Sequence, residues 1–311
     1  MKEIHRENDL LLLARALDSP VRLRIIRLLT QKGEMNLQAL AEALGITAGA
    51  VTAHIRVLEQ AGVVATQSRC ARRGSQKICA LREDRFLLDI ARQQDKADGE
   101  NAYEAEIPIG SFGRYAAHPT CGLATAERLI GEVDDPRCFD DPQRLSASIV
   151  WLFTGFLEYR LPNYLRVSRR ARELQISLEL SSEAPGTCED WPSDIHFYLN
   201  GVPLGFWTSP GDFGSRRGLY TPEWWPAVFN QYGLLKLLSV NERGSFVDGV
   251  KISDVRIGEI GLDYRSDLVF RLEVPGNDAP AGAHVGGMTL FGKNFGNYRQ
   301  DIRMRMLTGP A

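Results

Sequence analysis

Aromatic and acidic side chains gather in one stretch of the sequence, residues 187–236. This stretch holds four of the five tryptophans in the chain. Indole faces stack on the C–H face of a polyhydroxylated ring, while carboxylates and amides form hydrogen bonds with its hydroxyl groups. The composition therefore predicts a site for a small molecule, with a carbohydrate as the favoured class. The candidate ligand-binding residues are Trp191, Asp194, Trp207, Asp212, Arg216, Trp224, Trp225 and Asn230.

Part of this stretch is predicted in more detail. An Asn-Gly pair at 200–201 stands between two runs of alternating apolar residues, which is a strong signal for a tight β-hairpin. A two-residue turn there pairs Leu199 with Val202 across the strands. Continued without interruption, the same register sets Asp194 opposite Trp207. The hairpin thus predicts a carboxylate beside an indole.

A second kind of chemistry is predicted near the N-terminus. Between Glu59 and Glu83 the chain contains no carboxylate. The basic residues in this segment are Arg69, Arg72, Arg73, Lys77 and Arg82. Such a segment can neutralise backbone phosphates, with a salt dependence set by counterion release.

Helices are expected to position these basic residues. Apolar residues recur at three- and four-residue spacing through the first 60 residues and predict four helices that end near Leu17, Gly33, Gly45 and Gly62. Thr47 is expected to cap the fourth helix. Two strand-like runs, at 63–66 and 77–81, then flank a turn signal at 72–75, and helical spacing returns over 83–94.

Helices followed by a hairpin in this order predict a winged helix-turn-helix. In that arrangement the fourth helix faces the major groove and the hairpin lies along the DNA backbone. The candidate DNA-binding residues are Thr47, Gly49, Thr52, His54, Arg56, Arg69, Arg72, Arg73 and Lys77.

The remainder of the chain is predicted to be rich in strands. Strand-like runs separated by turn residues occur at 149–159, 173–180, 195–199, 202–207, 234–240, 267–274, 288–291 and 301–307, and a short helix is expected at 124–130. This pattern predicts an all-β sandwich or jelly roll. The fold class is therefore α+β multidomain, with a DNA-binding and dimerisation domain at 1–94, a linker at 95–106 and a ligand-sensing β domain at 107–311.

Composition agrees with a two-domain globular protein. The chain has 311 residues, of which 44% are hydrophobic and 24% charged. Residues 1–95 carry a net charge of +4 and the rest −6, which is typical of a nucleic-acid-binding module joined to a different domain. The five cysteines form no CxxC pair, and the longest apolar run, at 145–157, is shorter than the ~20 residues that a membrane helix needs. We expect a cytoplasmic protein that has no contact with a membrane.

The N-terminal sequence also resembles a known family. Residues 19–29, 40–47 and 51–64 are similar to ArsR-type winged-helix repressors. The resemblance implies a homodimer joined through the first helix and the helix after the wing, with specific DNA binding by residues 47–58. Metal-sensing members carry cysteines in the segment that corresponds to 34–38, and this chain has none there. The phrases at 119–124 and 189–195 resemble regulators that carry a large C-terminal β domain, which implies effector sensing.

Together these observations predict a homodimeric transcriptional regulator, a repressor rather than an enzyme, that needs no cofactor. Its partners would be a double-stranded DNA operator and a small-molecule effector, a carbohydrate in the favoured hypothesis. Three alternatives stay open. A thiol- or metal-responsive repressor would use Cys70 and Cys79, or Cys121, Cys138 and Cys188. A sugar-modifying enzyme would use Asp194 or Asp212, and a third possibility is that the β domain only widens the dimer interface.

Overall fold

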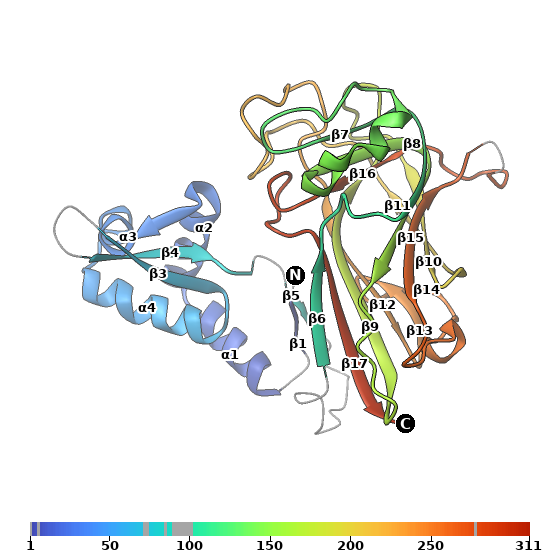
Figure 1. The fold of residues 1–311 in the computed structure, drawn as a ribbon. Helices are drawn as coiled ribbons and strands as arrows, with labels where there is room; N and C mark the ends of the chain where they lie inside the picture. The colour runs from blue at the N-terminus through green and yellow to red at the C-terminus, as the bar shows by residue number, and fades with distance from the viewer. Residues whose placement is uncertain (1, 5–6, 71–74, 84–85, 89–101, 277–278) are drawn as a thin grey trace. The chain divides into compact units, whose positions relative to one another are not determined.

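A computed structural model of the chain describes residues 2–4, 7–70, 75–83, 86–88, 102–276 and 279–311. The chain divides into two compact units, residues 1–96 and 97–311, each with its own hydrophobic core. The predicted class is confirmed, because the first unit is a helical module with a β-hairpin and the second is all β (Figure 1). Within the described residues, no helix is long and apolar enough to cross a membrane.

Four helices and three antiparallel strands make up most of the first unit. The helices are α1 (Glu7–Leu17), α2 (Pro20–Lys32), α3 (Leu37–Leu44) and α4 (Ala48–Gln60). The strands β2 (Glu34–Asn36), β4 (Ser75–Leu81) and β3 (Val64–Cys70) form one sheet in that order. Local capping explains the helix ends. Ser19 caps α2 just before Pro20, and Asn36 accepts a hydrogen bond from the Ala39 amide at 2.7 Å to begin α3.

The core of the first unit holds the helices together. Ile25 of α2, Leu40 of α3, and Val51 and Ile55 of α4 are buried in a single cluster. Within α4, Val51 and Ile55 are four residues apart, which is the helical spacing that the sequence displays.

One prediction in the first unit is wrong where the structure describes the chain. Residues 86–88, expected to be helical, form the short strand β5 (Phe86–Leu88), which pairs in parallel with β1 (Lys2–Ile4). This pairing supplies the backbone hydrogen bonds that a helix would have made, while Phe86 packs against the helical core. The rest of the expected helix, at 84–85 and 89–94, lies outside the described residues.

The predicted linker also changes. Residues 95–101 lie outside the described part of the chain, but 102–106 belong to strand β6 (Ala102–Ile107), which pairs with β17 (Ile302–Pro310). Because this segment is rich in polar residues such as Glu104 and Glu106, its sequence does not stand out as a strand. Tyr103, Ala105 and Ile107, on the opposite face of β6, contact the β core.

The second unit is built on one hydrogen-bonded network of strands that separates into two layers. The first layer contains β7 (Arg114–Ala124), β8 (Ile149–Leu161), β15 (Leu268–Val274), β10 (Ser193–Leu199) and β11 (Val202–Ser209). The second layer contains β6, β17, β9 (Arg169–Ser181), β12 (Leu234–Asn241), β13 (Gly244–Val247) and β14 (Val250–Ser253). The three short 3-10 helices are η1 (Pro136–Asp140), η2 (Pro142–Ser146) and η3 (Ile257–Ile260).

Strand β16 (Met288–Phe291) joins the two layers. It pairs with residues 149–152 of β8 on one side and 179–181 of β9 on the other. Farther along the same edge of β8, residues 155–161 pair with β15 instead, and β9 likewise turns to β17. The two layers therefore diverge from β16, and the main core fills the space between them.

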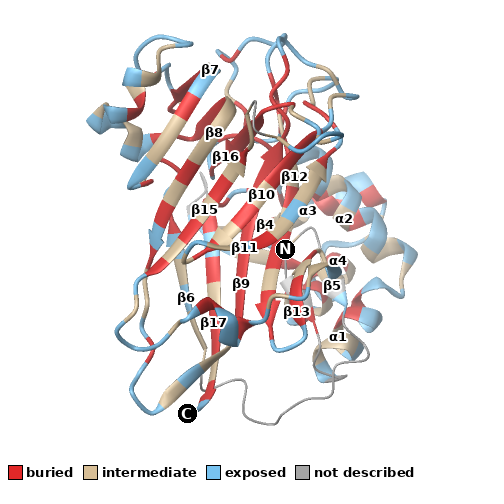
Figure 2. Ribbon diagram, turned by 90° about the vertical axis from the view of Figure 1, so that its right-hand side faces the viewer, coloured by how far each residue is buried: buried red, intermediate tan, exposed pale blue. Residues whose placement is uncertain are grey.

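Large apolar side chains from both layers fill this core. Tyr159, Phe197 and Phe270 come from the first layer, and Leu178 and Met304 from the second. Buried and less buried residues alternate along strands such as β15, as Figure 2 shows for the first layer. Every strand predicted from the sequence in this unit is present, so the sandwich prediction is confirmed.

The helix expected at 124–130 is absent. Ala124 instead ends β7, and an isolated bridge joins it to Leu129. The Thr125 hydroxyl accepts hydrogen bonds from the amides of Glu127 and Arg128, both at 3.1 Å. Such a side-chain bond favours a turn over a continued helix.

The Asn-Gly hairpin forms, but with a different register. Leu199 lies opposite Val202 as predicted, and a bulge between Phe197 and Tyr198 then shifts the pairing by one residue. Asp194 consequently lies opposite Thr208, not Trp207. The bulge is accommodated at Gly205, whose φ of 110° and position against the Ile252 carbonyl disfavour any larger residue.

Candidate nucleic-acid interface and effector site

Helix α4 is set by the turn that precedes it. Gly45 ends α3 in the left-handed region at φ 69°, a conformation that glycine adopts without strain. Thr47 then begins α4, with its hydroxyl oxygen accepting a hydrogen bond from the Ala50 amide at 3.2 Å. Val51, Ile55 and Leu58 bury one side of α4 in the core. The opposite side of the helix is left to solvent.

The candidate DNA-binding residues of α4 lie mainly on that exposed side. Gly49, Thr52 and Arg56 follow one another at helical spacing, and all three are exposed. A β-carbon added at Gly49 would have no atom closer than 4.0 Å, so packing does not require glycine there. His54 is half-buried, at the border of this surface. Among the candidate residues of α4, His54 is therefore the least accessible.

The hairpin carries less uncompensated charge than its sequence indicates. Arg69 forms a two-point ion pair with Glu34 of β2, with N–O distances of 2.7 and 3.0 Å. Lys77 lies 3.2 Å from Glu59 at the end of α4. Arg72 and Arg73 lie outside the described residues. The sheet brings these carboxylates to the hairpin from distant sequence positions, which a count along the chain does not reveal.

These pairs remain available for exchange. Arg69, Glu34, Lys77 and Glu59 all keep about a third or more of their side-chain surface exposed. Exposed ion pairs contribute about 0–1 kcal/mol, so a DNA phosphate can replace the carboxylate at small cost. Together, the exposed side of α4 and the adjacent hairpin have the geometry to contact a groove and its backbone.

In the β unit, Trp225 and Asn230 are two of four buried candidate ligand residues, the others being Asp194 and Asp212. Trp225 is only 3% exposed and packs edge-on against Trp151 and Phe295, with ring centroids 5.7 and 5.2 Å away. Its indole N–H donates to the Asn230 carbonyl at 2.9 Å. The Asn230 amide in turn donates to Glu183 and Thr289, both at 2.7 Å. Both side chains are therefore fixed by internal contacts.

Asp194 and Trp207 do not form the predicted pair. Asp194 accepts hydrogen bonds from the Thr208 hydroxyl at 2.6 Å and from the His284 amide at 2.9 Å. Burial raises the pKa of Asp194, but these bonds outweigh it and hold the pKa below its usual value. Trp207 lies opposite Ile195, and the Lys236 ammonium stands 4.4 Å from the centre of its ring.

Asp212 lies in a buried acidic site that the sequence did not predict. Its side chain is fully buried, and one oxygen accepts from the Ala184 amide at 3.0 Å while the other has no partner among the described residues. Burial raises the pKa of Asp212 to about 7, opposed by that hydrogen bond. Burial and the nearby charge of Asp212 raise the pKa of Glu183 well above its usual value.

Glu183 is the residue that sequence reasoning missed. Besides Asn230, the Thr289 and Thr120 hydroxyls donate to its carboxylate, at 2.8 and 3.3 Å. These partners come from three separate parts of the chain. No local signal marks the residue, because its role depends on long-range packing.

The other candidates lie at or near the surface. Trp191 is half-buried, and its indole N–H has no hydrogen-bond partner among the described residues. Arg216 is exposed and stacks on Tyr232 at 4.9 Å. Trp224 is 39% exposed, and its N–H donates to the Ala126 carbonyl at 2.6 Å. The structure thus brings Trp224, Trp225 and Asn230 together. It does not gather all the candidate ligand residues into one site.

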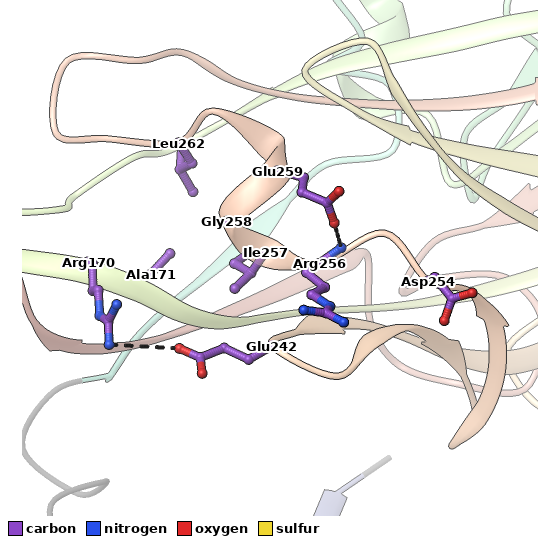
Figure 3. Close-up of a pocket in the computed structure, with 9 residues that line it drawn as sticks. All are labelled: Arg170, Ala171, Glu242, Asp254, Arg256, Ile257, Gly258, Glu259 and Leu262. Atoms are coloured by element: carbon purple, nitrogen blue, oxygen red, sulfur yellow. Dashed lines mark hydrogen bonds and ion pairs between the residues drawn. The ribbon is translucent and has the colours of Figure 1, made fainter.

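Hollows in the β unit lie elsewhere. One of about 790 Å³ opens beside η3 and is lined by Arg170, Ala171, Glu242, Asp254, Arg256, Ile257, Gly258, Glu259 and Leu262 (Figure 3). Two of its charged groups form an ion pair, and a third binds a backbone amide. Arg170 lies 3.9 Å from Glu242, and Glu259 accepts from the Arg256 amide at 2.7 Å. A second hollow, of about 690 Å³, lies on the outer face of the first layer.

The cysteines are described except for the Cys70 side chain. Burial raises the pKa of Cys79 to about 11 and that of Cys121 to about 12, so both thiols are protonated at neutral pH. Cys138 and Cys188 are half-buried free thiols. Among the described residues, no group of three or more histidine, cysteine or acidic side chains is placed to hold a metal ion.

The fold and the surface of α4 define the first unit as a winged helix-turn-helix module. Consistent with this, residues 17–67 match a family model described as a helix-turn-helix domain. A search of curated proteins found no match for the chain.

Solved structures give similar, partial matches. One is a possible transcriptional regulatory protein from Mycobacterium bovis (fragment 1–100), 24% identical over 24% of this chain and 76% of that one, with a TM-score of 0.22. A solution structure from M. bovis, described as a homodimeric winged helix-turn-helix DNA-binding domain of a possible ArsR-family transcriptional regulator, is 25% identical over 24% and 66% of the two chains, with a TM-score of 0.22. NolR from Sinorhizobium fredii is 26% identical over 25% and 72%, also with a TM-score of 0.22.

Proposed function

We propose that this protein is a homodimeric DNA-binding transcriptional regulator, a repressor, in which the first unit (1–96) binds an operator and the β unit (97–311) senses an effector. The observation that carries the proposal is the exposed side of α4, set by the turn at Gly45 and Thr47. A single helix of this kind fits the major groove of double-stranded DNA. A regulator of this type acts where its operator lies, in the cytoplasm.

In this proposal α4 supplies the base contacts. Thr52 and Arg56 reach base edges or phosphates, and Gly49 allows the helix backbone to come close to the DNA. His54 contributes from the border of the surface. Thr47 holds the helix end whose amides face the phosphates.

The hairpin supplies backbone contacts. Arg69 and Lys77 exchange their carboxylate partners for phosphates, and Arg72 and Arg73 are expected to act with them. Each phosphate neutralised makes the slope of log K against log salt concentration more negative by about 0.9.

Dimerisation fits the exposed apolar side chains of the first unit. Leu11 and Leu17 of α1 and Leu88 of β5 are 48%, 39% and 47% exposed. An isolated module gains by covering such residues, since burial of apolar surface contributes roughly 25 cal/mol per Å². A two-fold dimer would place its two α4 helices in major grooves about 34 Å apart.

The β unit controls this spacing in our proposal. An effector that binds one dimer geometry more tightly shifts the population toward that geometry. A tenfold loss of operator affinity needs a coupling free energy of only about 1.4 kcal/mol. The favoured effector is a carbohydrate, and binding without turnover is proposed because the Glu183 carboxylate is already engaged by Thr120, Asn230 and Thr289.

Fluorescence anisotropy with full-length protein tests the DNA-binding assignment. The probe is a duplex from upstream of the protein's own gene, titrated at several salt concentrations. Arg56→Ala is expected to weaken binding at least tenfold, whereas Arg166→Ala, an equal charge change at an exposed site of the β unit, should leave it within twofold. Equal effects of the two substitutions would contradict the assignment of α4.

A further inference from the structure

The outer face of the first β layer carries a row of polar and aromatic side chains. Glu158 of β8 lies opposite Arg271 of β15, and Arg271 lies opposite Tyr198 of β10. Directly opposed residues of antiparallel strands share one face of the sheet. A neighbouring row runs through Phe156, Glu273, His196 and Phe206. Residues alternating with these rows, such as Leu157 and Leu272, point into the core.

Arg271 organises this face. Its guanidinium lies 3.2 Å from Glu158 and 3.1 Å from Glu273, and stands 3.8 Å from the centre of the Phe156 ring. Three contacts on one side chain fix its orientation. The guanidinium and both carboxylates are thereby held as hydrogen-bonding groups with little freedom left to lose on binding a ligand.

The hollow of about 690 Å³ lies over this row. Its lining includes Arg114, Arg160, Arg271, Glu158, Asp267 and Tyr198. Each arginine has an acidic partner, since Arg160 lies 2.9 Å from Asp267 and Arg114 lies 3.4 Å from Glu158. The lining carries three arginines and two carboxylates, and Glu273, which binds Arg271 from the adjacent row, brings the formal charge of this face to zero. With every guanidinium paired, the face favours neither an anion nor a cation. Its volume is typical of a small-molecule site.

Aromatic rings border the hollow. Tyr198 lines it, and on the adjacent row the rings of His196 and Phe206 pack against each other at an interplanar angle of 33°, with centroids 5.1 Å apart. Phe206 lies within strand β11, and its side chain is nevertheless 47% exposed. An exposed aromatic platform beside fixed donors and acceptors matches a ring that has both an apolar face and hydroxyl groups.

We propose that this face, centred on Arg271 and Tyr198 with Phe206 at its border, binds a neutral saccharide. The inference rests on the proposed function only for the regulatory consequence of binding. It places the carbohydrate away from most of the tryptophans of 187–236, of which Trp225 is interior and Trp207 is covered by Lys236. The balanced charge selects a neutral saccharide over a sugar phosphate.

Isothermal titration calorimetry on the full-length protein tests the site directly. The probes are glucose, galactose, xylose, arabinose, maltose and cellobiose, with glucose 6-phosphate as the charged arm. At least one neutral sugar should bind, and Tyr198→Ala and Phe206→Ala should each weaken it about tenfold or more. Trp224→Ala, an exposed aromatic of the 187–236 cluster, should leave the affinity within twofold. Circular dichroism melts confirm that each variant is folded.

Three results would overturn the site: no binding of any neutral sugar, tighter binding of the sugar phosphate, or loss on Trp224→Ala with retention in the Tyr198 and Phe206 variants. A parallel anisotropy titration with DNA separates this inference from the proposed function. Sugar that binds this face without altering DNA affinity supports the site and contradicts effector control. Sugar that alters DNA affinity equally in wild type and in the Tyr198 and Phe206 variants contradicts the site alone.

Discussion

The Asp212→Asn substitution tests the buried acidic site through its pH dependence. The Asp212 carboxyl is fully buried, and burial raises its pKa to about 7, from an ordinary value of 3.8. Above pH 3.8 the unfolded chain releases this proton while the folded protein retains it, so folding becomes less favourable as pH rises toward 7. Asparagine keeps the size and the oxygen that accepts from Ala184, but it does not ionise.

The magnitude follows from the pKa difference at 1.36 kcal/mol per unit. Between pH 5 and pH 8, Asp212 should lower the free energy of unfolding by about 3 kcal/mol in the wild type, and this decrease should vanish in the variant. Asp212→Asn is therefore expected to be more stable than wild type at pH 8 and much closer to it at pH 5. Glu183, whose pKa is raised as well, adds a decrease of the same sign to both proteins.

Urea unfolding monitored by tryptophan fluorescence measures this change. All five tryptophans lie in residues 97–311, so the signal reports the β unit alone. Asp267→Asn is the matched control, because Asp267 is 69% exposed in a surface ion pair. An identical decrease from pH 5 to pH 8 in wild type and Asp212→Asn would refute the reasoning.

Three further predictions concern other parts of the chain. Gly205→Ala should destabilise the β unit by about 1–3 kcal/mol in the same urea assay. An alanine at φ 110° is strained, and its β-carbon would stand 3.0 Å from the Ile252 carbonyl oxygen. The control Gly258→Ala, whose β-carbon would meet no atom within 4 Å, should cost far less. Thr47→Ala should lower the stability of the first unit by about 1 kcal/mol through loss of the α4 cap, measured by hydrogen exchange of α4 amides; unchanged exchange would contradict the role of the cap. Glu34→Gln should strengthen non-specific DNA binding at low salt by releasing Arg69, and anisotropy that shows weaker or unchanged binding would argue against a phosphate contact from Arg69.

The helices were predictable because their signals are local. Ser19 and Thr47 cap the helices that follow them, Gly45 ends α3, and the apolar spacing of α4 marks its buried side. Each of these features depends on residues within about one helical turn. The same reasoning identified the exposed surface of α4.

Features that depend on distant contacts were not predictable. The bulge at Gly205 shifted the register of the hairpin and separated Asp194 from Trp207, and the polar face of β6 concealed a strand. Glu34 reaches Arg69 only because β2 pairs with β4. A one-residue shift in register moves side chains to new partners, and no local pattern in 187–236 specifies it.

The residues of the candidate effector site were likewise not predictable from local sequence. The aromatic and acidic residues of 187–236 are close together in the sequence. Trp225 and Asn230, however, are buried and make contacts within the protein. The row through Glu158, Arg271 and Tyr198 draws instead on three strands that are far apart in the chain. Its members become neighbours only through strand pairing.

Footprinting of the full-length protein on the DNA upstream of its own gene tests the central claim most directly. At about 0.15 M salt we predict protection of two half-sites whose centres lie about one helical turn, ~34 Å, apart or a multiple of it, with no comparable protection of a random duplex. Protection that is absent, or equal on both duplexes, would contradict the claim that α4 reads an operator.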